Sequence, residues 1–372
     1  MHIQVKKLLP LGAIALSAIF CATTAFALEI PRPDTVARSM TYDDMQLTVR
    51  GNESLVDVTQ DLYFHGGTHP NESWFTTSNL TAKSGDSIGL QTHFIGKLLP
   101  NGATILAVNF GIINETTGAY KSYEQIYQMK DATLSQDSFL VKSPEGSMSG
   151  DEESIHVLAS FDDVKIDLNL KNVRPPLINN AQGKISFFDG LDQYEYAFTA
   201  METSGQIDIG ANSYDVSGIS WFDRQFGEAT PLTAYSKDQW VWFNPQLDNG
   251  VSLSIWQIYQ FDKKEIRLQA TAALANGSQV VAFIDPIEMS DYWVSPVTGK
   301  RFPTQFDVSI PELDSKMHFE IPYKAQEILS GELSRKVVNS VSKYEGKMIV
   351  SGSMFGEAVK GEGYVELVGR WK

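Results

Sequence analysis

Cysteine is almost absent from this sequence of 372 residues, which contains only Cys21. A disulfide-stapled scaffold and a cysteine-based zinc site are therefore both excluded. Basic residues are also scarce, because 30 lysines and arginines stand against 45 aspartates and glutamates, a net charge of −15. Nucleic-acid surfaces need clustered lysine and arginine, so we expect no nucleic-acid partner. The 42% of hydrophobic residues is enough for a packed core.

The first 27 residues have the composition of a signal peptide. Lys6 and Lys7 precede an apolar run, and Ala25 and Ala27 flank a cleavage pattern of the small-x-small type. The run is too short to span a bilayer, so we expect cleavage and no integral membrane anchor afterwards. The lone cysteine leaves with the signal. We expect a periplasmic or secreted protein that is a monomer or a weak oligomer.

The rest of the chain is predicted to be β-structure throughout. Apolar and polar residues alternate with period two over 88–94, 251–255 and 317–321. The stretch 206–216, with glycine and asparagine at its centre, is predicted to form a hairpin. A short helix is expected over 122–133. We predict two β-domains of related architecture, over 28–230 and 231–372, packed together.

Common catalytic signatures are missing. The sequence has no Gly-x-Ser-x-Gly elbow, no His-Glu-x-x-His zinc motif and no complete dinucleotide fingerprint. His65 and His69 have helical spacing, but the glycines between them and Pro70 after them make a helical metal site improbable. We therefore expect no metal and no cofactor.

One segment, 218–227, concentrates polar and aromatic side chains. In a strand, Trp221, Asp223 and Gln225 point to one face and Arg224 points to the other. A buried carboxylate costs several kcal/mol unless it is paired or protonated. Asp223 is therefore expected either to line a cavity or to be bound to a partner.

Five motifs in order resemble a known family. They read Gly-x-x-Trp-x-Asp-Arg-Gln-Phe-Gly, Trp-x-Trp-Phe-x-x-Gln-Leu-Asp-x-Gly, Trp-x-Ser-Pro-x-Thr-Gly-x-x-Phe-Pro, Tyr-Glu-Gly and Gly-Tyr-Val-Glu-Leu-Val-Gly, at 218–227, 240–250, 293–303, 344–346 and 363–369. The chain resembles the carotenoid 1,2-hydratase (CrtC) / AttH family of lipocalin-like proteins, in particular its broad bacterial secreted group.

The resemblance implies an all-β fold with two packed lipocalin-like antiparallel β-barrel or sandwich domains and a mostly apolar ligand cavity. Family members include carotenoid hydratases and fungal cyclases that promote Diels–Alder reactions, and many bacterial relatives are known only as predicted secreted hydrolases. Because one fold hosts several activities, the resemblance specifies the fold better than the chemistry.

The function that we expect is acid-assisted hydration, hydrolysis or cyclisation of a bulky hydrophobic small molecule such as a terpenoid, polyketide or lipid. A carboxylic acid among aromatic rings has a raised pKa and donates a proton at neutral pH, and tryptophan faces stabilise a developing carbocation. Asp223 is the expected donor, with Glu72 and Glu366 as alternatives. Ligand contacts are expected from Trp74, Trp221, Gln225, Trp240, Trp242, Gln246, Trp256, Gln257, Trp293 and Tyr364.

The same residues have structural interpretations. Asp223 and Arg224 would clamp the two domains together, Arg224 and Asp248 being the expected structural residues. Tryptophans also pack in cores, and Glu345 and Glu366 are typical of solvated strand residues or of residues that stabilise turns. The alternative function is a non-catalytic, lipocalin-like carrier. An unpaired Asp223 beside a cavity favours the enzyme, whereas an Asp223 bound to backbone amides favours the carrier.

Overall fold

The computed structural model describes residues 54–229, 237–332, 335 and 342–371. They form two large antiparallel sheets, which confirms the predicted all-β antiparallel class. The predicted signal peptide and the predicted domain boundary near residue 230 lie outside the described residues, so both stay predictions. No described helix is long and apolar enough to cross a membrane.

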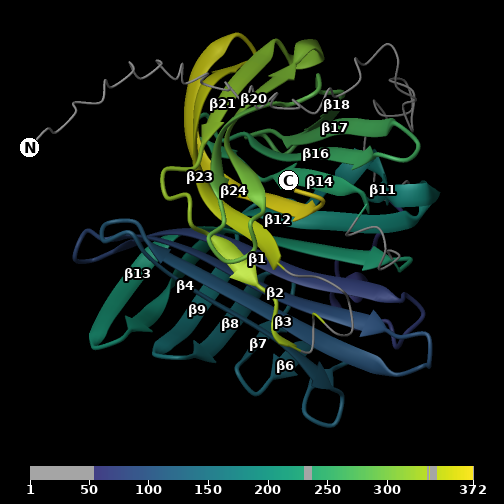
Figure 1. The fold of residues 1–372 in the computed structure, drawn as a ribbon, viewed down its shortest axis with the longest axis vertical. Coiled ribbons are helices and arrows are strands. Elements are labelled where there is room, and N and C mark those ends of the chain that lie inside the picture. Colours follow the sequence, from purple (N-terminus) through teal and green to yellow (C-terminus); the bar gives the residue numbers. More distant parts are fainter. Residues whose placement is uncertain (1–53, 230–236, 333–334, 336–341, 372) are drawn as a thin grey trace, which may run out of the picture. The chain divides into compact units, whose positions relative to one another are not determined.

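The first sheet is a continuous run of neighbouring strands in the order β4-β3-β2-β1-β13-β12-β9-β8-β7-β6-β5, with β10 and β11 paired to β12. Figure 1 shows these strands side by side in a strongly curled sheet. Their bounds are β1 Asn71–Ala82, β2 Ser87–Leu98, β3 Thr104–Asn114, β4 Ala119–Gln128, β5 Thr133–Leu134, β6 Phe139–Ser143, β7 Gly146–Gly150, β8 Ser154–Phe161, β9 Val164–Asn172, β10 Leu177–Ile178, β11 Lys184–Ser186, β12 Asp192–Ile209 and β13 Asn212–Gly227.

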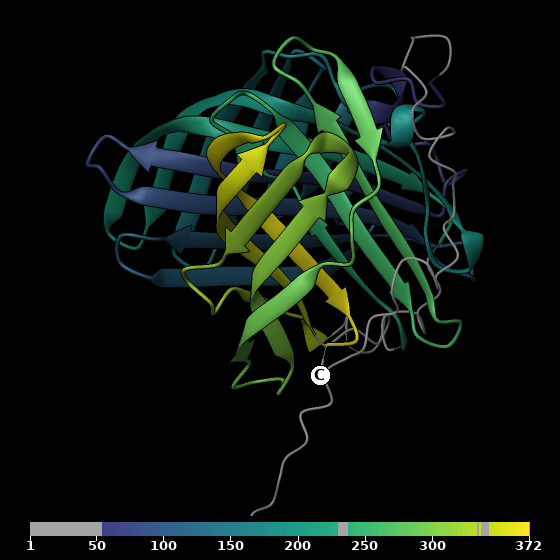
Figure 2. The same cartoon turned by 90° about the horizontal axis from the view of Figure 1, so that it is seen from above.

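The second sheet has the order β18-β17-β16-β14-β24-β23-β21-β20-β19, with β15 paired to β16 and β24, and β22 paired to β23. It is also curled, as Figure 2 shows. Its strands are β14 Gln239–Phe243, β15 Gln246–Leu247, β16 Ser252–Gln260, β17 Glu265–Ala273, β18 Gln279–Ala282, β19 Glu288–Val294, β20 Arg301–Ile310, β21 Ser315–Glu320, β22 Glu327–Leu329, β23 Ser342–Met354 and β24 Glu357–Gly369. Short 3-10 turns lie at Gln60–Leu62, Asn179–Ala181, Phe188–Gly190 and Pro311–Leu313.

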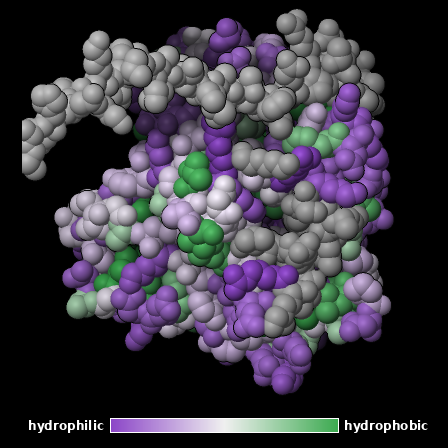
Figure 3. Space-filling view, viewed as in Figure 1, coloured by the Kyte–Doolittle hydropathy of each residue, from purple (hydrophilic) through white to green (hydrophobic). Residues whose placement is uncertain are grey.

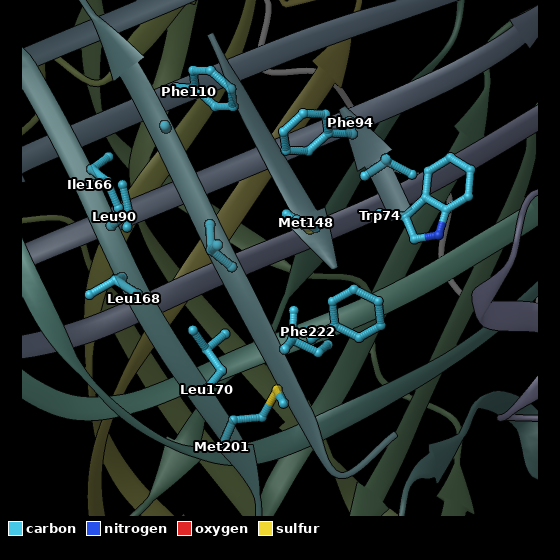
Figure 4. Close-up of a cluster of buried hydrophobic side chains, with 14 of the residues drawn as sticks. Trp74, Leu90, Phe94, Phe110, Met148, Ile166, Leu168, Leu170, Met201 and Phe222 are labelled. Atoms are coloured by element: carbon cyan, nitrogen blue, oxygen red, sulfur yellow. The ribbon is translucent and has the colours of Figure 1, made fainter. Parts of the chain in front are cut away.

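The concave side of the first sheet is filled by its own side chains. Along β9 buried and exposed residues alternate strictly, because successive side chains of a strand point to opposite faces. The buried set forms one cluster that includes Trp74, Phe94, Phe110 and Phe222, drawn in Figure 4. The interior of this sheet is therefore packed core.

Two local predictions had different outcomes. The hairpin over 206–216 is confirmed, since Ile209 pairs with Asn212 and Gly210 takes a φ of +62° in the turn. The helix over 122–133 is wrong. Its first part lies in β4 and pairs with β3 along its length, and a turn then leads to β5. Pairing with a long neighbouring strand outweighed the weak helical spacing of its apolar residues.

A second core cluster contains most of the tryptophans. Trp221 contributes from the first sheet, and Trp240, Trp242 and Trp256 from the second, so this cluster joins the two sheets. On the face shown in Figure 3 the described surface is mostly polar, with hydrophobic residues in small separate patches. Most of the aromatic supply lies inside the molecule.

Candidate functional site

Strand register brings the polar residues of the first sheet onto one face. Phe75 of β1 pairs with Asp223 of β13 on one side and with His93 of β2 on the other. Ser73 pairs with Gln225 and lies two positions from Phe75, so it shares their face. This is the face predicted for Asp223 and Gln225, opposite to the packed interior of the sheet.

Both sheets line a cavity at this face. Its volume is about 140 Å³, and its lining includes Ser73, His93 and Gln225 from the first sheet and Trp240 and Glu366 from the second. A smaller cavity of about 30 Å³ shares four of these five residues and extends to the carboxyl groups. It is lined by Ser73, Phe75, His93, Glu195, Asp223, Gln225, Trp242, Trp256 and Glu366.

The larger cavity has an apolar part. Aliphatic side chains from β2, β3, β4, β22 and β24 form it, together with the ring of Phe187. These aliphatic residues are Ile95, Ile105, Ala107, Ile126, Ile328 and Val368. The site thus combines an apolar region with a cluster of acids, which is typical of small-molecule pockets.

Asp223 is the predicted donor, and the structure places it in the smaller cavity. It is buried, with 6% of its surface exposed, and among the described residues it accepts one hydrogen bond, from Nε1 of Trp221 at 3.2 Å. No backbone amide of the described residues donates to it. Burial, and secondarily the nearby charge of Glu366, raises the pKa of Asp223 well above its ordinary value. The carboxyl group of Asp223 therefore favours its protonated form and lies beside a cavity.

Glu195, which the sequence analysis did not propose, lies beside Asp223. It pairs with Gln225 across the β12–β13 ladder and is fully buried. Asn179 donates to its Oε1 at 2.6 Å, and the amide of Gln225 donates to Oε2 at 3.2 Å. Burial first, then the charges of Asp223 and Glu366, raises the pKa of Glu195 well above its ordinary value. Two adjacent carboxyl groups thus favour protonation.

Glu366 and Glu345 are directly opposite each other on β24 and β23. Glu345 is 1% exposed and Glu366 9% exposed, so their interpretation as solvated residues is wrong. Nε1 of Trp240 donates to Glu366 at 2.6 Å. The ammonium of Lys343 lies 2.7 Å from Oε1 of Glu345 and 3.7 Å from Oε2 of Glu366. Burial raises the pKa of Glu345 well above its ordinary value despite this lysine.

His93 connects the two sheets at this point. Its Nδ1 is 2.8 Å from Nζ of Lys343, and its Nε2 is 2.6 Å from Oγ of Ser73. Burial, reinforced by Lys343 and Lys97, lowers the pKa of His93 well below 6.5, so the ring is neutral at neutral pH. His93, Glu345 and Glu366 are close enough to ligate one metal ion. The ammonium of Lys343 is the cation that contacts this group of side chains.

Glu72 and Arg224 lie away from the cavities. Arg224 is fully buried and forms an ion pair with Glu72. It also donates to the carbonyls of Asp61, Tyr63, Ser73 and Gln225. All these partners belong to the first sheet or to the segment before it, so among the described residues Arg224 does not connect the two sheets. The pair secures the segment before β1 to the sheet.

The predicted ligand-binding residues separate into two groups. Gln225, Trp240, Trp242 and Trp256 line the cavities. Trp221 donates a hydrogen bond to Asp223, which lines the smaller cavity.

The second group lies elsewhere. Trp74 is in the interior of the first sheet, with Arg224 over its ring at 4.1 Å, and Trp293 packs on Phe302. Gln246 donates to the carbonyl of Thr199, and Gln257 accepts from the amide of Ile287. Tyr364 is buried on β24, and Asp248 accepts from the amide of Lys360 at an exposed turn.

Comparison with known proteins agrees with this architecture. The sequence matches the AttH-like family over residues 50–370. A search of curated proteins finds no match. The crystal structure of an AttH protein from Nitrosomonas europaea is 18% identical, with a TM-score of 0.72 covering 87% of this chain and 99% of that one.

Two further solved structures carry enzyme or ligand names. Kievitone hydratase from Nectria haematococca is 17% identical, with a TM-score of 0.71 covering 87% of this chain and 96% of that one. CghA, solved with Sch210972, is 11% identical, with a TM-score of 0.54 covering 87% and 98%. At these identities the likeness establishes a shared fold and leaves activity open. The family match extends over most of the chain, as the five motifs predicted, and the protein belongs to the AttH-like family.

Proposed function

We propose that this protein is an enzyme that binds a hydrophobic small molecule between its two sheets and adds water to one of its double bonds. The observation that carries the proposal is Asp223, a buried carboxyl group with a raised pKa, beside a cavity lined by tryptophans. The names of kievitone hydratase and CghA, proteins of the same fold, support a small-molecule substrate. A cyclisation would use the same first step.

The proposed reaction begins with proton transfer from the carboxyl group of Asp223 to an alkene carbon. The neighbouring carbon then becomes cationic, and the faces of Trp242 and Trp256 stabilise its charge together with the carboxyl group of Glu366. Water attacks this carbon and loses a proton to the carboxylate of Asp223. The donor is regenerated, and the product has gained one molecule of water.

The neighbours of Asp223 maintain its protonated form. Burial, and secondarily the nearby charge of Glu366, disfavours a negative charge on Asp223, and the cavity excludes most solvent from the group. Glu195 is held by Asn179 and Gln225, which orients it beside the donor. A neutral acid at neutral pH is what a donor to a weakly basic carbon requires. We also propose, from the N-terminal sequence, that the enzyme acts in the periplasm or outside the cell.

The test compares the wild-type protein with Asp223→Asn on a panel of unsaturated apolar compounds in isotopically labelled water. Asp137→Asn makes the same chemical change at an exposed turn and serves as the control. We expect label to enter a product with the wild type and the control, and turnover to fall by about 10²–10⁴-fold in Asp223→Asn. Tight binding of panel compounds without labelled product, or unchanged turnover in Asp223→Asn, would refute the proposal, and the first result would identify a carrier.

A further inference from the structure

Three side chains form a hydrogen-bonded chain from the second sheet to the cavity. Nζ of Lys343 lies 2.8 Å from Nδ1 of His93, and Nε2 of His93 lies 2.6 Å from Oγ of Ser73. Lys343, His93 and Ser73 all line the larger cavity, and His93 and Ser73 line the smaller one as well. This chain has no role in the proton transfer proposed for Asp223.

The direction of the chain follows from the chemistry of its groups. An ammonium has only donor hydrogens, so Nζ of Lys343 donates to Nδ1 of His93. Nδ1 of His93 must then accept through its lone pair. A neutral imidazole carries its hydrogen on the other nitrogen, so Nε2 donates to Oγ of Ser73. The hydrogen bonds all point from Lys343 towards the cavity.

This direction excludes one interpretation of the serine and histidine. A nucleophilic serine needs a histidine nitrogen with a free lone pair to take its proton. Nε2 of His93 carries a hydrogen instead, so Ser73 is not activated as a nucleophile. Its own hydroxyl hydrogen has no acceptor among the described residues, and the cavity lies beside it.

We infer that Lys343, His93 and Ser73 present one directed hydrogen-bond donor to the ligand, and that the ligand therefore carries an oxygen acceptor, such as a carbonyl or ether, next to its reactive apolar part. The inference rests on the proposed function, since it assumes that the ligand occupies the cavity beside Asp223. It narrows the substrate class to oxygenated apolar molecules and disfavours pure hydrocarbons.

The position of the donor relative to Asp223 adds to the inference. Ser73 pairs with Gln225 and Phe75 pairs with Asp223, so Ser73 and Asp223 are diagonal neighbours on one face. Side chains in this relation are about 7–8 Å apart at the backbone, within the span of a small organic group. One ligand can therefore contact Ser73 through its oxygen while a carbon a few bonds away faces Asp223. Each hydrogen bond polarises the next one, so the charge of Lys343 strengthens the terminal donor.

The first test measures binding of two matched probes, an aryl alkyl ketone and the hydrocarbon in which a methylene replaces its carbonyl. We expect Ser73→Ala to weaken ketone binding about tenfold and to change hydrocarbon binding by less than about twofold. Ser73→Thr retains the hydroxyl and should restore ketone binding. Ser78→Ala is the control, because Ser78 is a buried serine of the same strand that bonds Ser220 outside both cavities.

The second test is spectroscopic. The carbonyl stretch of the bound ketone should move to lower wavenumber in the wild type, in Ser73→Thr and in Ser78→Ala, and this shift should disappear in Ser73→Ala. Nitrogen NMR of labelled histidine should show His93 with its hydrogen on Nε2, and Lys343→Met should remove this preference. A hydrogen on Nδ1 in the wild type, or equal loss of both probes in Ser73→Ala, would overturn the inference.

These outcomes are separable from the proposed function. Asp223→Asn removes the proton donor but leaves the donor chain intact, so the carbonyl shift should persist while turnover is lost. If the enzyme is active but the carbonyl stretch of the bound ketone does not shift, the donor chain is refuted and the proposed function is not. A shift that is present in a protein without turnover supports the donor chain and refutes the enzyme.

Discussion

Replacing Asp223 by asparagine tests the state of the buried acid without knowledge of the substrate. The raised pKa means that folded Asp223 retains its proton at pH values where the unfolded chain releases it, above the ordinary value of 3.8. The stability associated with this proton is complete below 3.8 and is lost as the pH rises through the folded pKa. The wild-type protein should therefore lose stability from mildly acidic towards neutral pH.

The size of the effect follows from proton linkage. Where the folded protein holds one more proton than the unfolded chain, the free energy of unfolding falls by about 1.4 kcal/mol per pH unit. Asparagine cannot titrate, so in Asp223→Asn the free energy of unfolding should fall less steeply with pH, by up to about this slope. The charge of Asp223 also contributes to the raised pKa of Glu195. The variant should therefore lower the pKa of Glu195, which flattens the curve further.

The assay is urea unfolding of both proteins at unit steps of pH, with Asp137→Asn as the control at an exposed turn. We expect the difference in unfolding free energy between Asp223→Asn and the wild type to grow in favour of the variant as the pH rises. The control should run parallel to the wild type. Parallel curves for Asp223→Asn as well would show that Asp223 is not a buried protonated acid, and the proposed proton donor would have to be abandoned.

Three other substitutions test different parts of the structure. Arg224→Met removes the guanidinium from buried Glu72, leaving it with the ring of His65, and should cost about 3–5 kcal/mol in urea unfolding. A loss below about 1 kcal/mol would contradict the ion pair. Ala107→Phe should abolish binding of a ketone probe by filling the cavity, with less than about 3 kcal/mol of destabilisation, and retained binding would place the ligand elsewhere. Trp240→Phe removes the donor to Glu366 and should weaken probe binding about tenfold by calorimetry. An unchanged affinity would show that this hydrogen bond does not contribute to ligand binding.

Much of the fold was predictable because it is encoded locally. Period-two alternation over 88–94 and 317–321 corresponds to β2 and β21, and glycine at the centre of 206–216 specifies a turn. The segment 122–133 was not predictable in the same way. Its aromatic and polar residues fit both the helical period and the strand period, and the long pairing with β3 stabilises the strand.

The candidate site was predictable only in part. Trp221, Asp223 and Gln225 lie in one motif on β13, so strand alternation alone places them on one face. Glu195, Ser73 and His93 reach this face through the register of β12, β1 and β2, and register depends on contacts distant in sequence. The burial of Glu345 was not predictable from its neighbours in the sequence, because it depends on groups distant along the chain, such as His93 on β2 and Glu366 on β24.

The division of the site between the two sheets has a consequence for biosynthesis. Asp223 and Glu195 belong to strands that leave the ribosome before β14 to β24 are made. Until the second sheet covers them, these carboxyl groups face water and ionise as ordinary acids. Closure of the sheets must then remove protons from solution, so acidic surroundings favour the last step of maturation and alkaline surroundings oppose it.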